Sequence, residues 1–326
     1  MKNDMLMAKT DEPGVINLAV GEPGCLQDTF GVYGFYGDGE MPRQAYPPLA
    51  GTHTLLQELR LLHPGDDGIV VATGAKQALL AAIYAYRQIL SPKDNPLPLT
   101  VIHRRPYWPS HKTLAELAGC RFATQGGDIR INTSPNNPDG SIDHGPCDIW
   151  DAAYAHQMYG FRVEDTPPHE TAVYSAAKLL GMSGDRVGWL VTGDPKIARI
   201  AAAYIESTTS GVSIYSQQRV AHTLRRLREN PASAAEAYRG VEARLRENMV
   251  ALESALDMPI QGKGMFAWVK LTDSMVRHFA EAKVRYLPGE ACGMPGRARI
   301  NLGASDYLFD AAMQRLRKTQ QHGDDR

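Results

Sequence analysis

A lysine and an arginine eight residues apart, in the segment VYSAAKLLGMSGDRVGW, are the two side chains with the clearest chemical potential. An apolar run of strand type at 171–174 leads to Lys178, and a glycine-rich turn at 181–184 precedes Arg186, which opens a second strand. A lysine amine that is buried or set beside cations loses its proton near neutral pH and can form a Schiff base. The arginine can hold an anion such as a phosphate ester with its fork of donors. Most lysines are solvated surface residues, so other parts of the chain must support a site here.

Six short apolar segments alternate with helical patterns, and each leads to a polar, aromatic or glycine residue. This alternation predicts an α/β fold with a mostly parallel sheet, flanking helices, and a site along one edge of the sheet. Gly74 joins a strand to a helix, and the N–H groups of such a turn can bind a phosphate. The expected strands lie at 68–74, 99–103, 128–133, 147–151, 171–174 and 186–191, and the residues near their ends are Gly74, Trp108, Asn137, Asp151, Lys178 and Arg186.

The flanking parts of the chain predict further elements. A helix is expected to start near Thr52, whose hydroxyl can cap it. Beyond residue 194 we expect helices to about 256 with a break at Pro231, followed by a smaller α+β lobe. Arg299 falls inside an expected strand of that lobe, and a strand arginine needs a partner, for which a substrate carboxylate is one option.

Composition and charge exclude several classes of protein. The 326 residues allow a large core and two lobes, and 43% apolar and 22% charged residues with a formal net charge of −1 are ordinary for a globular protein. This balance gives no reason to expect nucleic acid or a membrane surface as a partner. Arginines between 219 and 246 alternate with glutamates at helical spacings, which indicates a solvated helix face.

Cysteine spacing and hydropathy predict a cytoplasmic, soluble protein without a metal. No C-x-x-C pair is present, so neither a zinc site nor a disulfide framework is indicated. The N-terminus has no apolar core of the signal-peptide type, and no stretch reaches the ~18 apolar residues of a membrane span. The four scattered cysteines are Cys25, Cys120, Cys147 and Cys292.

The ordered set of residues resembles the pyridoxal 5′-phosphate enzymes of fold type I, the aspartate aminotransferase superfamily, in register from about residue 16 to 305. The resemblance implies that Lys178 forms the Schiff base with this cofactor and that Asp151 faces its pyridine nitrogen, supported by His111. It also implies that Trp108 stacks on the ring. The residues that it places around the phosphate are Gly74, Ala75, Lys76, Ser175 and Arg186, and those that it places at the phenolic oxygen are Asn137 and Tyr154.

The same resemblance implies a substrate site and a homodimer. Arg299, in RARINLG, falls on the arginine that binds the substrate α-carboxylate, and Gly21 falls on a glycine beside the substrate. Tyr46, five residues before Gly51, is similar to a tyrosine that reaches the cofactor phosphate of the neighbouring subunit. The implied domains are an N-terminal segment at 1–35 that contributes to the small domain and an active-site loop, a large cofactor-binding domain at 36–215, and a small C-terminal α+β domain at 216–326.

Two departures from the family pattern narrow the resemblance. The family's S-x-S-K reads Ser175-Ala176-Ala177-Lys178 here, so one phosphate hydroxyl is missing. Only fourteen positions separate Asn137 from Asp151, which predicts that a crossover helix is reduced to a loop. The short link looks most like the alliinase and plant tryptophan aminotransferase branch.

This branch favours an amino-acid aminotransferase that passes an amino group to a 2-oxo acid, with aromatic substrates as one possibility. A C–S β-lyase of the alliinase type stays open, because it uses the same lysine. A specialised biosynthetic enzyme with the same cofactor and a non-catalytic descendant of the fold are the further alternatives.

Overall fold

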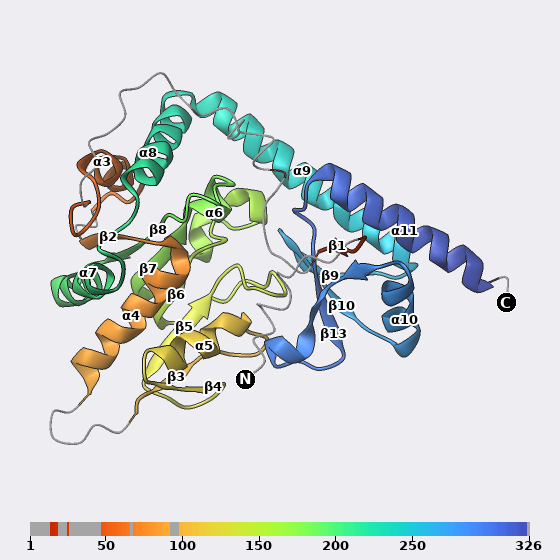
Figure 1. The fold of residues 1–326 in the computed structure, drawn as a ribbon, viewed down its shortest axis with the longest axis horizontal. Helices are drawn as coiled ribbons and strands as arrows, with labels where there is room; N and C mark the ends of the chain where they lie inside the picture. The colour runs from red at the N-terminus through yellow and green to blue at the C-terminus, as the bar shows by residue number, and fades with distance from the viewer. Residues whose placement is uncertain (1–13, 19–24, 26–46, 66–67, 92–97, 325–326) are drawn as a thin grey trace.

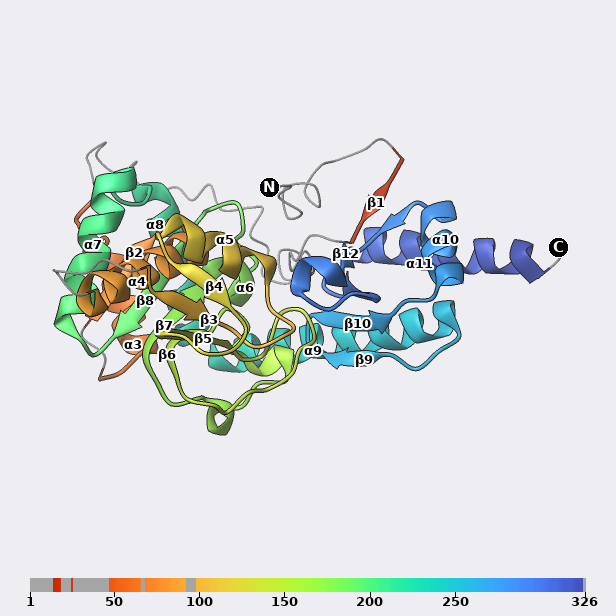
Figure 2. The ribbon, with the colours of Figure 1, turned by 90° about the horizontal axis from the view of Figure 1, so that it is seen from below.

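The computed structural model describes residues 14–18, 25, 47–65, 68–91 and 98–324, and these form two lobes joined by α9 (Pro231–Leu256) (Figure 1). The lobe on the left of Figure 1 contains a large sheet, and the lobe on the right contains a smaller one. In the view from below, the two lobes lie side by side along the length of the molecule (Figure 2). None of the described helices is long and apolar enough to cross a membrane.

The large sheet has seven strands in the spatial order β2-β8-β7-β6-β5-β3-β4. All neighbours pair in parallel except at β8, which runs antiparallel to both β2 and β7. This arrangement confirms the predicted mostly parallel sheet. The strands span Gly68–Ala72 (β2), Thr100–Ile102 (β3), Arg121–Ala123 (β4), Ile129–Thr133 (β5), Cys147–Asp151 (β6), His169–Ser175 (β7) and Gly188–Thr192 (β8).

Strand direction and register bring distant segments to one edge of this sheet. The strands β2, β5, β6 and β7 end at that edge, whereas the antiparallel β8 begins there. Gly188 pairs with Ala72 on one side and with Ser175 on the other. Asp151 pairs with Thr133 of the neighbouring strand. The chain segments that follow β2, β5, β6 and β7 therefore meet the segment that precedes β8, at an edge where α/β sheets bind ligands.

Three helices cover one face of the large sheet: α4 (Gly74–Leu90), α5 (Pro109–Leu117) and α7 (Pro195–Thr209). α4 buries a row of alanines together with Leu79 and Ile83, and the small side chains allow close packing against the strands. Asp194 begins α7 by accepting a hydrogen bond from the backbone N–H of Lys196 at 2.7 Å. This layer fixes where the sheet edge lies relative to the first turn of α4.

The helices α3 (His53–Leu62) and α8 (Ile214–Glu229) cover the opposite face over β2 and β8. The buried carboxylate of Glu58 joins them by accepting hydrogen bonds from Nε of Arg225 at 2.9 Å and Nε of Arg228 at 3.1 Å. The hydrogen bond from Arg228 and the weaker one from Arg225 lower the pKa of Glu58, although burial opposes this shift.

The predicted start of the first helix is right, but its predicted cap is wrong. α3 begins at His53, and the hydroxyl of Thr52 makes no hydrogen bond to any part of the chain that the structure describes. The backbone N–H of Thr52 instead donates to Oε1 of Gln217 at 2.7 Å. A side chain of α8 takes the place of the cap because α8 packs against the start of α3, which local sequence does not reveal.

The link between β5 and β6 contains no helix, as the short spacing predicts. Its backbone is held by side chains from other segments. Nε1 of Trp150 donates to the carbonyl of Ser134 at 3.0 Å, and Nε of Arg104 donates to Oδ2 of Asp143 at 2.6 Å. The edge strand β4, by contrast, was not predicted, since three residues with a polar flank carry too little periodicity.

The smaller lobe is built on an antiparallel sheet in the order β12-β13-β10-β9, covered by α9, α10 and α11. β1 (Ile16–Asn17) pairs in parallel with β11 (Val284–Arg285) and joins this lobe. The remaining elements are β9 (Gln261–Lys263), β10 (Phe266–Lys270), α10 (Asp273–Glu281), β12 (Leu287–Pro288), β13 (Arg297–Asn301) and α11 (Asp306–Asp324), the 3₁₀ turns η2 (Gln157–Tyr159), η3 (Val163–Asp165) and η4 (Gly289–Cys292), and the short helix α6 (Ala176–Leu179).

The packing of α8 bears on where one domain ends. Val220 and Leu224 of α8 lie in one apolar cluster with Ile69 and Val71 of the large sheet. We propose that the large domain extends through α8 to the break at Asn230, rather than ending at residue 215.

We expect Glu58→Gln to lower the free energy of unfolding by about 1 kcal/mol at pH 7, because charge-assisted bonds become neutral ones and the arginines are half-exposed. Since folding lowers the pKa of Glu58, its contribution is present above the unfolded-state pKa and is lost as the pH falls through the folded-state value. Urea unfolding should therefore show a smaller difference from wild type at pH 4 than at pH 7. The control Glu242→Gln removes an exposed pair with Arg246 and should change stability by less than about 0.5 kcal/mol. A pH-independent loss in Glu58→Gln would contradict this account.

Candidate active site

Gly74, in the first turn of α4, and Arg186, just before β8, lie against each other at the edge of the large sheet. We call this pair the Gly74–Arg186 cradle. Gly74 has a φ of +75°, and a Cβ atom placed there would collide with Nη2 of Arg186. Arg186 itself has a φ of +54° and donates from Nη1 to the carbonyl of Ser183 at 3.0 Å, which holds the guanidinium against the helix start. Buried Ser175 is directly across from Gly188. A guanidinium beside the N–H groups of a 17-residue helix forms a site for an anion.

The second and third residues of α4 complete this corner. A Cβ atom on Gly188 would collide with the backbone nitrogen of Ala75, so β8 approaches the helix start as closely as glycine allows. Nζ of Lys76 lies 5.1 Å from the ring centroid of Trp108, a residue that immediately precedes α5. The cation and the indole therefore face each other across the edge of the sheet.

A buried carboxylate and a buried imidazole form the second part of the site. Nε2 of His111 lies 3.1 Å from Oδ2 of Asp151, and the two residues are 0% and 4% exposed. Oδ1 of Asp151 accepts a hydrogen bond from the backbone N–H of Ala153 at 3.3 Å. An ionised carboxylate only accepts hydrogen bonds, so the proton of this pair belongs on Nε2 of His111. The rings of Trp108 and His111 meet edge to face, at an interplanar angle of 87° and a centroid distance of 5.4 Å.

A third group of residues connects the two lobes. Asn137, from the short link, donates from Nδ2 to the hydroxyl of Tyr154 at 3.4 Å and accepts from Nη1 of Arg299 at 2.7 Å. Arg299 comes from β13 of the smaller lobe, and its guanidinium lies 4.5 Å from the ring centroid of Phe266. Burial lowers the pKa of Arg299 and raises that of Tyr154. A buried guanidinium favours an anionic ligand, because an opposite charge offsets part of its desolvation cost.

Lys178 lies on α6, the single helical turn that follows β7. The side chain is half-buried, and its backbone carbonyl accepts a hydrogen bond from the hydroxyl of Tyr159 at 2.8 Å. Burial raises the pKa of Tyr159, so this phenol stays protonated and donates. Because β7 ends at the same edge as β2 and β6, the lysine is delivered to the edge that carries Asp151 and Gly74.

The structure thus brings most of the predicted site residues to one sheet edge. Two other predicted site residues, Gly21 and Tyr46, lie outside the described residues. Sequence reasoning missed three residues that touch the site: His103, Tyr159 and Phe266. His103 had a usable signal, since it closes an expected strand, whereas the other two lie in segments without any pattern of chemical interest.

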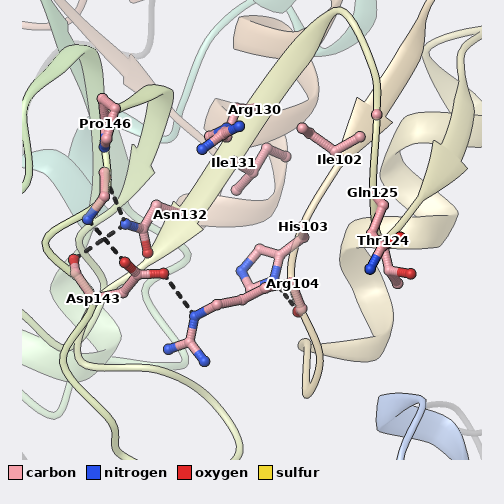
Figure 3. Close-up of a pocket in the computed structure, with 12 residues that line it drawn as sticks. Ile102, His103, Arg104, Thr124, Gln125, Arg130, Ile131, Asn132, Asp143 and Pro146 are labelled. Atoms are coloured by element: carbon pink, nitrogen blue, oxygen red, sulfur yellow. Dashed lines mark hydrogen bonds and ion pairs between the residues drawn. The ribbon is translucent and has the colours of Figure 1, made fainter.

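A cavity of about 360 Å³ lies next to this site, at the ends of β3, β4 and β5 (Figure 3). Arg104 and Asp143 line it and form an ion pair. Nδ2 of Asn132 donates to the carbonyls of Asp143 and Gly145 at 3.1 Å each. The charges of Arg104 and Asp143 offset each other, and Arg130 adds a second cation to the residues that line the cavity.

The arrangement fits a flat, phosphorylated cofactor. Glycine at 74 allows the Arg186 guanidinium to lie against the first turn of α4, where a Cβ atom would collide with it, so the guanidinium and the N–H groups of the helix can contact the same anion. Trp108 offers a ring face, Asp151 a buried carboxylate and Lys178 an amine, which together suit a pyridine ring with an aldehyde and a phosphate. Among the residues whose positions are described, no cluster of three histidine, cysteine or acidic side chains could hold a metal ion.

Comparison with known proteins shows the family to which this chain is similar. A family model described as allinase matches residues 63–259, more than half of the chain. Tryptophan aminotransferase-related protein 2 of Arabidopsis thaliana is 33% identical over 49% of this chain and 39% of that protein. Tryptophan aminotransferase-related protein 1 of Oryza sativa subsp. japonica is 29% identical over 74% of this chain and 60% of that protein. Aspartate/prephenate aminotransferase of Thermus thermophilus is 26% identical over 83% of this chain and 82% of that protein. The matches therefore span only 39% and 60% of the lengths of these two plant relatives.

Solved structures show the same fold. The aspartate aminotransferase from Thermus thermophilus with maleate superposes with a TM-score of 0.70 at 19% identity, over 97% of this chain and 94% of that chain. The aromatic aminotransferase from Pyrococcus horikoshii OT3 gives a TM-score of 0.70 at 17% identity, over 98% and 99%. These likenesses confirm the predicted fold type I architecture, whose families depend on pyridoxal 5′-phosphate. The chain belongs to the allinase family and has the aspartate aminotransferase fold.

Proposed function

We propose that this chain is a pyridoxal 5′-phosphate-dependent amino-acid aminotransferase that transfers an amino group from an amino acid to a 2-oxo acid. The observation that carries the proposal is the meeting of the Asp151–His111 pair and the Gly74–Arg186 cradle with Lys178 at one sheet edge. The names of the plant relatives support aromatic amino acids as substrates.

When bound, the cofactor supplies a cationic ring that withdraws electrons from the substrate α-carbon. Asp151 would hold the proton on the ring nitrogen, and the hydrogen bond from His111 would orient that carboxylate. Trp108 would stack on the ring, and Tyr154 and Asn137 would face the phenolic oxygen.

Three groups would anchor the phosphate at the cradle. These are the guanidinium of Arg186, the hydroxyl of Ser175 and the N–H groups at 74–76, with Lys76 adding a positive charge. The missing second hydroxyl before Lys178 leaves these groups with a larger share of the binding energy.

Lys178 would hold the cofactor covalently through its amine and, once displaced by the substrate amine, would carry the proton away from the α-carbon. Arg299 would pair with the α-carboxylate, and Asn137 would hold the guanidinium in place from the opposite lobe. Gly21 would lie beside the substrate, as the resemblance implies.

Assembly and location are also proposals. We infer a homodimer in which Tyr46 contacts the cofactor phosphate of the partner subunit, because aminotransferases of this fold typically work as dimers. We infer a cytoplasmic, soluble protein from its composition and its scattered cysteines.

A C–S β-lyase is the second candidate, and the allinase family match supports it. Both reactions begin with the loss of the α-proton, and they differ in its fate. In the lyase the electron pair left at the α-carbon would expel a β-sulfur group, whereas in the transferase the proton would be delivered to the cofactor side. A specialised biosynthetic enzyme and a non-catalytic descendant are the remaining readings.

Product analysis with Lys178→Ala as the inactive reference tests the reaction. We expect a visible absorbance band in the wild type with added cofactor, its loss in Lys178→Ala, and product formation that requires a 2-oxo acid. The control Lys196→Ala, an exposed lysine on α7, should keep both. Pyruvate and ammonia formed without a 2-oxo acid would identify the lyase instead. Absence of the band in the wild type would overturn the enzymatic reading.

Gly74→Ala tests the anion cradle. The new Cβ atom would displace the guanidinium of Arg186, so the affinity of the cofactor-free protein for pyridoxal 5′-phosphate should fall at least about tenfold in a titration. Gly65→Ala is a matched control, because Gly65 has a φ of +89° and nothing within 4 Å of a new Cβ atom. Both variants carry a backbone cost of about 1–2 kcal/mol, and only Gly74→Ala should lose affinity. Equal affinities in the two variants would show that the cradle does not bind the phosphate.

Arg299→Gln tests substrate recognition. Loss of a charge-assisted pair with the substrate carboxylate should lower kcat/KM about 100-fold, equivalent to about 2.7 kcal/mol, mainly through KM. Arg297→Gln is the control on the same strand, since Arg297 is only partly buried and bonds to Gln261 at 3.4 Å. An unchanged KM in Arg299→Gln, with the cofactor band intact, would place the carboxylate elsewhere.

A further inference from the structure

Two imidazole rings stack beside the buried carboxylate, and only one of them touches it. The ring of His103 lies 4.7 Å from that of His111, with an interplanar angle of 23°. The two histidines come from different segments, His103 from the end of β3 and His111 from α5. Both are buried, at 2% and 0% exposed.

Each ring is tied to one member of a cross-strand pair. Thr133 of β5 and Asp151 of β6 are register partners. Nε2 of His103 lies 3.1 Å from Oγ1 of Thr133, and Nε2 of His111 lies 3.1 Å from Oδ2 of Asp151. The pairing of Thr133 with Asp151 therefore sets the distance between the two imidazoles.

The contacts of His103 define a neutral ring with a single tautomer. Nδ1 lies 2.7 Å from the carbonyl oxygen of Arg104, which only accepts, so Nδ1 carries the proton. Nε2 is then an acceptor for the hydroxyl of Thr133. Burial lowers the pKa of His103. The ring therefore has a fixed plane and carries no charge.

His111 has fewer contacts of its own. Nδ1 is buried and has no hydrogen-bond partner among the residues that the structure describes. A protonated imidazole would place an unsatisfied N–H donor there, which costs more than leaving a weak acceptor unmade. The orientation of this ring therefore depends on its hydrogen bond to Asp151 and on two neighbouring rings, those of His103 and Trp108.

We propose that His103 is a positioning residue: its hydrogen-bonded ring stacks on His111 and holds that imidazole in the neutral form whose Nε2–H points at Asp151. A rotation of the His111 ring out of the plane that stacks on His103 would carry Nε2 away from Oδ2 of Asp151 and remove the donor from the carboxylate. His103 donates nothing to the cofactor and acts only through His111. The effect of His103 on cofactor binding rests on the proposed use of Asp151 by pyridoxal 5′-phosphate. The tautomer of His111 does not depend on that proposal.

The charged groups around this stack are consistent with the proposal. Asp151 faces His111 from β6, the backbone of Arg104 faces His103 from the end of β3, and Lys76 faces Trp108 from α4. The Arg104 guanidinium is directed to Asp143 and not to the imidazoles. Figure 3 shows His103 and Arg104 on the wall of the neighbouring cavity, so the His103 ring separates that cavity from His111.

Imidazole nitrogen NMR on the cofactor-free protein tests the tautomer directly. In the wild type we expect His111 as the neutral Nε2–H form and His103 as the neutral Nδ1–H form at pH 7, with His111→Gln used for assignment. In His103→Ala the His111 signals should broaden or move toward a mixture of tautomers. Thr133→Val keeps both rings and removes one hydrogen bond, so it should produce the same change in milder form. If His103→Ala fails to fold, the Thr133→Val variant still tests the proposal.

His63→Ala is the matched control. His63 is also a partly buried histidine that contacts an aromatic ring, with its ring centroid 4.4 Å from that of Tyr174, and it accepts a hydrogen bond from Nε1 of Trp189 at 2.9 Å. It lies at the end of α3 on the opposite face of the sheet. Its loss should lower the melting temperature and leave the His111 signals unchanged.

With cofactor added, His103→Ala should bind pyridoxal 5′-phosphate about tenfold more weakly, and the pH profile of the visible band should shift, while His63→Ala matches wild type. Unchanged His111 signals and unchanged affinity in both His103→Ala and Thr133→Val would overturn the proposal and leave His103 a packing residue. A His111 that is protonated or Nδ1–H in the wild type would overturn it as well. Failure of the wild type to bind the cofactor would refute the proposed function and not the NMR result.

Discussion

The reversed direction of one strand, β8, is the constraint on which the rest of the site depends. Its neighbours β2 and β7 both run toward the functional edge, and β8 starts there, with Gly188 paired to each of them. A parallel strand at this place would have carried Arg186 to the far end of the sheet. The reversal sets the guanidinium against the first turn of α4, and glycine at 74 and 188 makes room for that approach.

Buried charge is the second organising feature. Asp151 and Arg299 are almost fully buried, and an ion in such surroundings costs several kcal/mol unless hydrogen bonds and an opposite charge compensate it. The chain supplies hydrogen bonds from His111 to the carboxylate and from the arginine to Asn137. A ligand with a cationic ring and an anionic carboxylate would place an opposite charge beside each of these two ions. The hydrogen bonds of Asp151 and Arg299 are thus in place before a ligand binds, so binding energy is not needed to orient these two side chains.

Much of the fold and of the site followed from local patterns. Apolar runs bounded by glycine or polar residues predicted the parallel strands, with β6 correct to the residue, and the fourteen-residue spacing predicted the loss of a helix between β5 and β6. The spacing of Lys178 and Arg186 indicated that both residues lie at one edge of the sheet, because strand ends in such sheets converge. Local signals failed at β4, which is too short to show a period, and at Thr52, whose cap comes from Gln217 in a distant helix.

The sequence by itself therefore determined which residues stand at strand ends, since period and turn chemistry are properties of neighbouring residues. Tertiary structure decided which of those ends touch. Asn137 meets Arg299 across 162 positions of chain, because two lobes close on each other there. Phe266 lies under the same guanidinium because β10 pairs with β13. The stack of His103 on His111 arises in the same way, from the register of Thr133 with Asp151. Contacts of this kind depend on strand order and side-chain packing, which no local pattern encodes.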